Sequence, residues 1–198
     1  MNGVTTVLVV GVGGQGVLLA AAILAESAVA EGFDVKASEV KGMAQRGGSV
    51  LSTVRFGDKV WSPVSRRADV VVALELLEGR RGLDLLGPRG TLVCAATTRI
   101  VPGSVLRRED EYPDDLAAAA EDQSARLIAL DAEDLAREAG TLRAINVVLL
   151  GAASTVLPFG RASWERGLGA AVPAKILEVN ERAFALGRDA VGSEEIGA

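Results

Sequence analysis

Apolar runs and helix-forming stretches alternate along most of the chain. The apolar runs are short, and they lack the polar alternation of a half-exposed strand, which is typical of strands covered on both faces. The expected strands are residues 5–10, 68–76, 90–96 and 126–130, with helices at 17–31, 77–86, 114–122 and 132–139 between them. This order predicts an α/β domain whose sheet is mostly parallel.

The segment 33–64 departs from that simple alternation. Residues 33–40 are interpreted as the second strand of a βαβ unit, and a glycine-rich loop follows them. The runs 49–57 and 59–64 meet around Gly57-Asp58-Lys59 and predict a β-hairpin, in which Pro63 ends the second strand. A plain nucleotide-binding fold does not need this insertion.

The C-terminal third is predicted to be helical. Residues 143–157 carry no charge after Arg143, so we expect this helix to be covered on more than one side, by its own domain or by another subunit. Two amphipathic helices follow at 163–172 and 173–191, with Pro173 near the start of the second. We therefore predict one Rossmann-like domain over residues 1–191, with a mostly parallel sheet, a β-hairpin insertion and C-terminal helices, and a frayed tail at 192–198.

Charge and the N-terminus narrow the classes of partner. The 198 residues include 26 acidic and 21 basic side chains, without a long basic run, so nucleic acid is not an expected partner. The first charged residue is Glu26, yet Met1-Asn2-Gly3 has no basic character, and clustered glycines would weaken a spanning helix. We expect a cytoplasmic protein without a membrane segment.

Two absences limit the chemistry of the chain. It contains no histidine, which removes the usual general base and the commonest transition-metal ligand. Its single cysteine, Cys94, cannot form an internal disulfide or ligate an iron–sulfur cluster by itself. Cys94 lies in the apolar run "GTLVCAA", which favours a core thiol over a reactive one. We predict no catalytic residue and no metal site in this chain.

A glycine-rich turn follows the first expected strand. The sequence "VLVVGVGGQGVLL" places Gly11, Gly13, Gly14 and Gly16 around Gln15, within the spacing G-x-G-x-x-G. Glu39, 23 residues beyond Gly16, stands near the place of the acidic residue of a dinucleotide site. Three interpretations stay open: a dinucleotide site, a turn whose glycines serve packing alone, and a shared interface to which Gln15 contributes hydrogen bonds.

A second loop carries the residues Arg46-Gly47-Gly48-Ser49. One guanidinium beside a glycine pair and a hydroxyl suits a phosphate, a carboxylate or an acidic partner surface, and the alternative is a solvated surface loop. Both loops follow the carboxyl ends of expected strands, where open α/β sheets usually bind ligands. We therefore expect them to share one site.

The two loops together resemble a known family. The segment "GVGGQGVLLAAAILAESAVAEGFDVKASEVKGMAQRGGSVLSTVRFG" is similar to the start of the gamma-type domain of the 2-oxoacid:ferredoxin oxidoreductases. The form "GMAQRGGSV", with Met43, Gln45 and Arg46, resembles the indolepyruvate branch of that family. The resemblance resumes in "INVVLLGAASTVLPF" and "VPAKILEVNERAFALGR", while residues 97–140 are the least distinctive. Lys41 stands where members of the branch often have histidine, so no proton transfer is assigned to that position.

The resemblance implies an accessory subunit of a hetero-oligomeric complex. The family converts a 2-oxoacid, here an arylpyruvate, and coenzyme A into an acyl-CoA and CO2, and passes two electrons to ferredoxin. It places thiamine diphosphate and the iron–sulfur clusters on the large subunit. In agreement, Gly57-Asp58 is followed here by Lys59 rather than by the glycine of a thiamine diphosphate motif. This chain is not expected to hold any of these cofactors alone.

The resemblance also suggests what the two loops do. Residues Gly11–Gly16 and Arg46–Ser49 are expected to form an edge of a composite site or of the subunit contact, where they position coenzyme A or shape the pocket beside thiamine diphosphate. The first helix and the uncharged helix near 144–157 could also be buried against the large subunit. The alternatives are a gamma subunit for another 2-oxoacid, a free-standing NAD(P)- or flavin-binding module, and a purely structural scaffold subunit.

Overall fold

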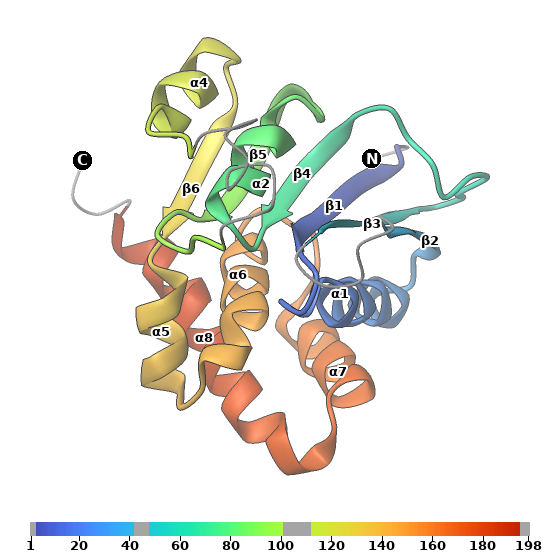
Figure 1. Ribbon diagram of the computed structural model, residues 1–198. Helices are drawn as coiled ribbons and strands as arrows, with labels where there is room; N and C mark the ends of the chain where they lie inside the picture. Colours follow the sequence, from blue (N-terminus) through green and yellow to red (C-terminus); the bar gives the residue numbers. More distant parts are fainter. Residues whose placement is uncertain (1–2, 42–47, 101–111, 195–198) are drawn as a thin grey trace.

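The computed structural model describes residues 3–41, 48–100 and 112–194, which form one sheet with helices on both faces (Figure 1). The strands are β1 (Thr5–Val12), β2 (Asp34–Lys41), β3 (Ser49–Gly57), β4 (Ala68–Ala73), β5 (Leu86–Ala95) and β6 (Arg126–Leu130). The helices are α1 (Val17–Glu31), α2 (Leu76–Leu83), α4 (Leu116–Asp122), α5 (Ala132–Ala139), α6 (Ile145–Ala153), α7 (Arg161–Ala171) and α8 (Leu177–Glu194), with 3-10 turns η1 (Leu142–Ala144) and η2 (Ala174–Ile176). The predicted α/β class is confirmed.

The strand order is β2-β3-β1-β4-β5-β6. Strands β1, β4, β5 and β6 run parallel to one another, whereas β3 is antiparallel to both β1 and β2. Strand β2 therefore runs in the same direction as β1, as a βαβ unit requires, but β3 separates the two. The connections from β1 and β4 lead to opposite sides of the sheet, which makes the carboxyl ends of these two strands a topological switch point.

The predicted partner of β3 is wrong. Residues 59–64 form no strand, and β3 instead pairs with β2, which precedes it. Two carbonyls of the expected strand, those of Ser62 and Val64, accept hydrogen bonds from the Arg55 guanidinium at 2.6 and 3.0 Å. Pro63 offers no backbone N–H. The turn residues Gly57-Asp58-Lys59 therefore do not lead into a second strand, because the contacts of the Arg55 side chain hold residues 58–67 as a loop.

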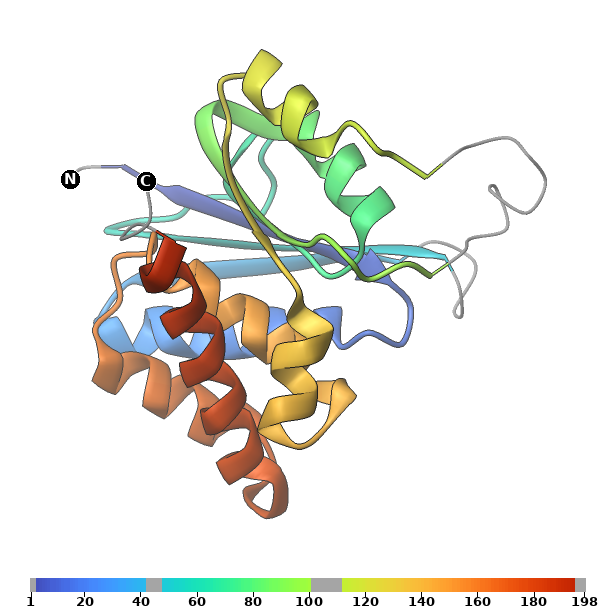
Figure 2. The same ribbon diagram turned by 90° about the vertical axis from the view of Figure 1, so that its left-hand side faces the viewer.

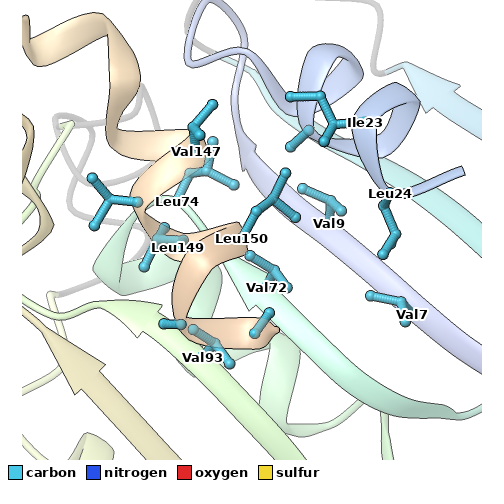
Figure 3. Close-up of a cluster of buried hydrophobic side chains, with 14 of the residues drawn as sticks. Val7, Val9, Ile23, Leu24, Val72, Leu74, Val93, Val147, Leu149 and Leu150 are labelled. Atoms are coloured by element: carbon cyan, nitrogen blue, oxygen red, sulfur yellow. The ribbon is translucent and has the colours of Figure 1, made fainter. Parts of the chain in front are cut away.

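Two layers of helices cover the sheet. Helices α1, α5, α6, α7 and α8 lie on one face, and α2 and α4 lie on the other (Figure 2). Helix α6 occupies the centre of the larger layer, and every residue from Asn146 to Ala153 is buried. In Figure 3 its side chains Val147, Leu149 and Leu150 are grouped with apolar side chains of the strands and of α1.

The uncharged stretch near 143–157 is thus covered by its own domain. Helix α8 packs on its outer side, where Gly151 and Gly187 permit very close approach, because a Cβ at either would overlap a carbonyl oxygen of the other helix. The idea that this helix is buried against a large subunit is therefore wrong. Helix α8 also continues to Glu194, past the predicted start of the tail at 192, and residues 195–198 lie outside the described residues.

Cys94 is a core thiol, as predicted. It is fully buried in β5 beside Gly79 of α2, where its sulfur leaves no room for a larger residue. Burial, reinforced by the negative charge of Glu75, raises the pKa of the thiol to about 12. The thiolate that nucleophilic chemistry needs is therefore absent near neutral pH.

Candidate functional site

The glycine turn lies at the carboxyl edge of the sheet, at the switch point between β1 and β4. Gly14 and Gly16 have φ angles of 104° and 83°, in the left-handed region that favours glycine. The backbone N–H of Gly13 donates to the carbonyl of Gly48 at 2.9 Å. The structure therefore brings the first loop together with the end of the second, as the sequence predicts.

Gln15 stabilises this turn from within. Its Oε1 accepts a hydrogen bond from the backbone N–H of Val12, and its Nε2 donates to the carbonyl of Leu74, both at 2.7 Å. These bonds tie the end of β1 to the segment that follows β4. A Cβ at Gly11 would lie only 2.9 Å from the Gln15 Oε1, so the first glycine makes room for this amide. Both of these hydrogen bonds stay inside the chain, and the predicted role of Gln15 across an interface stays a prediction.

Asn146 holds the other side of the turn, and sequence reasoning missed it. Its side chain is 1% exposed, and its Nδ2 donates to the carbonyl of Gly16 at 3.1 Å. A Cβ at Gly16 would lie 2.6 Å from that nitrogen. The available signal was an asparagine near the start of a long uncharged run, a position where a polar side chain needs a buried partner.

A cleft of about 420 Å³ opens beside the turn. Its polar lining residues include Arg99, Arg143 and Thr98. Thr98 is 4% exposed, and its buried Oγ1 has no hydrogen-bond partner among the described residues. The remaining lining comes from the turn, α1, α5, η1 and α6: Gly14, Gln15, Gly16, Leu19, Ile100, Glu133, Leu142, Ile145 and Asn146. Two arginines against the single carboxylate of Glu133, beside apolar side chains and a helix N-terminus, suit an amphipathic anion.

A second polar group lies on the α2 side of the same edge. Ser49 Oγ donates to Glu78 Oε2 at 2.6 Å, and the Arg81 guanidinium donates to Glu78 Oε1 at 2.8 Å. Glu75 caps α2 by accepting from the backbone N–H of Glu78 at 2.9 Å, and also accepts from the N–H of Ile100 at 3.3 Å. These contacts anchor the start of β3, directly after the second loop.

The two glutamates of this group are almost completely buried, with Glu75 1% and Glu78 5% exposed. Burial and the Glu75 carboxylate raise the pKa of the nearby Tyr112 hydroxyl. The sequence analysis did not single out either acid. The usable signal was a pair of glutamates, three residues apart, directly after an apolar strand. The capping bond of Glu75 also explains why β4 ends at Ala73, earlier than predicted.

Glu39 does not take the place of a dinucleotide-site acid. It lies on β2, opposite Ser52 of β3, and is exposed. With neighbouring strands about 4.8 Å apart, the inserted β3 places β2 roughly 10 Å from β1 rather than beside it. The dinucleotide fingerprint needs this acid on the strand adjacent to the glycine turn. The other predicted site residues of the second loop, Met43, Gln45, Arg46 and Gly47, lie outside the described residues.

Within the ranges 3–41, 48–100 and 112–194, no group of three acidic or sulfur side chains could hold a metal ion. In the same ranges no helix has both the length and the apolar character needed to cross a bilayer.

Comparison with known proteins gives concordant matches. Residues 6–190 match the family model described as pyruvate ferredoxin/flavodoxin oxidoreductase. The indolepyruvate oxidoreductase subunit IorB of Thermococcus kodakarensis is 38% identical over 188 residues, which cover 91% of this chain and 93% of that protein. The keto/oxoacid ferredoxin oxidoreductase gamma subunit of Geobacter sulfurreducens shares the fold, with a TM-score of 0.73 and 23% identity over 96% of this chain and 99% of that one.

A further structural match is part of a longer chain. The 2-oxoglutarate:ferredoxin oxidoreductase of Magnetococcus marinus, solved with 2-oxoglutarate, coenzyme A and succinyl-CoA, aligns with a TM-score of 0.74 and 19% identity. The alignment covers 96% of this chain but only 31% of that one. The same fold therefore occurs both as a separate chain and as one portion of a larger polypeptide.

Proposed function

Because the chain belongs to the pyruvate ferredoxin/flavodoxin oxidoreductase family, we propose that it is the accessory subunit of an arylpyruvate:ferredoxin oxidoreductase complex. The observation that carries this proposal is the 38% identity to an indolepyruvate oxidoreductase subunit over nearly the full length of both chains. The complex would oxidatively decarboxylate a 2-oxoacid with coenzyme A, release an acyl-CoA and CO2, and pass two electrons to ferredoxin. It would work in the cytoplasm.

The residues of this chain do not fit the cofactors of that reaction. Its one thiol is buried in the core, so it cannot ligate an iron–sulfur cluster. Gly57-Asp58 leads into the loop that follows β3 and lacks the next glycine of a thiamine diphosphate motif. When bound to the large subunit, thiamine diphosphate would supply the carbanion chemistry and the clusters would carry electrons. The accessory subunit would contribute binding surface and no proton carrier or nucleophile.

We propose that the cleft beside the glycine turn forms one wall of the coenzyme A site. Coenzyme A combines phosphate groups with a long pantetheine arm. The cleft offers Arg99 and Arg143 for the phosphates, and Leu19 and Ile145 for the apolar parts of the arm. The backbone N–H groups at the start of α1 add positive potential without a side-chain cap to neutralise it. In this proposal the second loop, with Arg46, contributes to the same wall, while Gln15 and Asn146 keep the turn in place.

The test is reconstitution with a large subunit of the same family from the same organism. We expect turnover of indole-3-pyruvate and phenylpyruvate, followed with coenzyme A and a low-potential dye, only when both subunits are present. Preference for pyruvate or 2-oxoglutarate would move the chain to another branch of the family. Absence of turnover with every 2-oxoacid, or micromolar binding of NAD(P) or flavin by the isolated chain, would refute the proposal.

Substitutions then separate a ligand-binding wall from a structural scaffold. Arg143→Ala should raise KM for coenzyme A about tenfold or more and leave kcat nearly unchanged, because one charge-assisted hydrogen bond contributes about 1.5–3 kcal/mol. Arg161→Ala is the matched control, since that side chain is 92% exposed on α7, away from the cleft. Equal KM values for both variants and the wild type would indicate that this cleft does not contact coenzyme A.

A further inference from the structure

In the part of the chain that the structure describes, helices cover one face of the sheet over only part of its width. Helix α1 packs on β1, β2 and β3 from one side, whereas α2 packs on β1, β4 and β5 from the other. In Figure 1 the described helices on the α2 side lie over the β4–β6 half, away from β2 and β3. The α2-side surface of β2 and β3, together with the loop of residues 58–67 that lies against it, is called here the Trp61 face.

The most exposed large apolar side chains of the described residues gather on this face. Trp61 is 86% exposed, Val64 69% and Val40 62%. Val40 shares the face with Ser38, because alternate residues of a strand point to the same side. The Ser38 hydroxyl donates to the carbonyl of Pro63 at 3.4 Å, which places the loop over that same side. The three apolar side chains therefore belong to one surface.

The loop that carries Trp61 is held firmly by the rest of the fold. Val60 is 1% exposed, and its backbone N–H donates to Asp34 Oδ2 at 2.9 Å. Arg55 binds the carbonyls of Ser62 and Val64 from the neighbouring strand. The Trp61 side chain is exposed, but the backbone on both sides of it is held by these hydrogen bonds. A preorganised, exposed tryptophan is typical of a binding hot spot, because little conformational entropy remains to be lost on association.

The charges around Trp61 indicate the chemistry of its partner. Residues 55–67 include four basic side chains and one acidic side chain, although the whole chain carries a formal charge of −5. Lys59 Nζ lies 5.4 Å from the centre of the Trp61 ring and 3.5 Å from Asp34 Oδ2, with which it forms an exposed ion pair. A complementary surface would offer an apolar socket with carboxylates at its rim. A second copy of this chain fits poorly, since a two-fold contact would oppose two basic faces.

We infer that the Trp61 face is where this chain docks on the larger subunit of its complex. The same fold occupies 31% of the longer Magnetococcus marinus chain, so it is a portion that a larger polypeptide can carry covalently. As a separate chain it needs a noncovalent surface for the same neighbours, and the Trp61 face has the apolar anchor and the charge for it. This inference rests on the proposed function, because that function supplies the larger subunit.

The experiment places a probe on the face and follows binding of the larger subunit. Val64→Cys is labelled with an environment-sensitive fluorophore, and the buried Cys94 does not compete for the label. Val29→Cys, 55% exposed on α1, is the matched control on the opposite side of the sheet. We expect the emission of the label at position 64 to change saturably with the larger subunit, while the label at 29 reports no change.

Substitution then tests the anchor. Trp61→Ala should raise the dissociation constant for the larger subunit at least tenfold at unchanged thermal stability. Lys59→Glu should also raise this constant, most strongly at low ionic strength. Wild-type affinity in both variants, a response at position 29 instead of 64, or dimers of the isolated chain that Trp61→Ala dissolves would each overturn the docking surface. If the variants assemble and turn over like the wild type, the proposed function stands and only the surface is wrong. If the wild type binds no larger subunit, both are wrong.

Discussion

Replacement of Gly16 by alanine tests the geometry of the turn most directly. Gly16 precedes α1 with φ 83° and ψ 27°, a left-handed conformation that costs an alanine about 1–2 kcal/mol. The new Cβ would also lie 2.6 Å from Asn146 Nδ2, so that amide must move and release its hydrogen bond to the Gly16 carbonyl. The lost bond contributes about 1 kcal/mol. We expect Gly16→Ala to lower the free energy of unfolding by about 2–3 kcal/mol.

Gly14 provides the matched control within the same turn. Its φ is 104°, but a Cβ there would meet nothing within 4 Å. Gly14→Ala should therefore carry the backbone strain alone, partly offset by about 0.4–1 kcal/mol from the reduced entropy of the unfolded chain. The difference between the two alanine variants isolates the overlap with Asn146. Adding Asn146→Ala to Gly16→Ala removes the overlap, so the double variant should be about 1 kcal/mol more stable than the sum of the single effects predicts.

Urea unfolding at neutral pH, followed by circular dichroism, gives the free energy of unfolding of the wild type, the three single variants and the double variant. Calorimetry checks these values. For a domain of this size 1 kcal/mol corresponds to about 2–4 °C in Tm, so Gly16→Ala should melt about 4–12 °C below the wild type. Equal destabilisation by Gly14→Ala and Gly16→Ala, or additive effects of Gly16→Ala and Asn146→Ala within about 0.4 kcal/mol, would show that Asn146 does not pack on this glycine.

Three further predictions follow from the contacts of single side chains. Gln15→Glu should destabilise the fold by about 1–3 kcal/mol in urea unfolding, because a carboxylate cannot donate to the Leu74 carbonyl; wild-type stability would contradict that bond. Cys94 should stay unreactive toward a disulfide reagent until the protein is unfolded, when one thiol reacts; rapid labelling of the native chain would contradict its burial. Hydrogen bonds from Ser163 and Gly160 lower the pKa of Glu31, so its stabilising effect should be complete above about pH 4.3 and lost as the pH falls through the lowered value. Glu31→Gln should therefore be slightly less stable than the wild type at pH 7 and equally stable in acid, and a gap that persists in acid would refute this cause.

Elements whose boundaries depend on local signals could be predicted from the sequence. Helix α1 ends at Gly32 in the left-handed conformation, and β6 and α5 match the expected ranges 126–130 and 132–139. The strand that pairs with β3 could not be predicted from the sequence, because strand pairing is a long-range property. A Gly-Asp turn at 57–58 is a strong local signal for a hairpin, and nothing local reveals that Arg55 will bind the carbonyls that a following strand would need.

The candidate site was predictable in its backbone and much less so in its side chains. Glycines at a strand–helix junction predict a close approach, and Gly13 does bond to Gly48 of the second loop. Asn146 lies 130 residues from Gly16, and the cleft arginines come from segments with no recognisable motif. A buried polar side chain is visible in sequence only as an exception in an apolar run, and its partner becomes visible only once the fold brings the two together.

The inserted strand β3 counts against the dinucleotide interpretation of the glycine motif. In a dinucleotide fold the turn after the first strand binds the pyrophosphate, while an acid on the adjacent strand binds the ribose. Here β3 separates β1 from β2, so Glu39 is one strand too far away, although its spacing along the sequence is correct. Within the turn, the Gln15 amide and Asn146 bind the backbone of Val12 and Gly16. Gly11 and Gly16 therefore make room for two polar side chains that bind the backbone, and the cleft that the turn lines with Arg99 and Arg143 is where we propose that an anion binds.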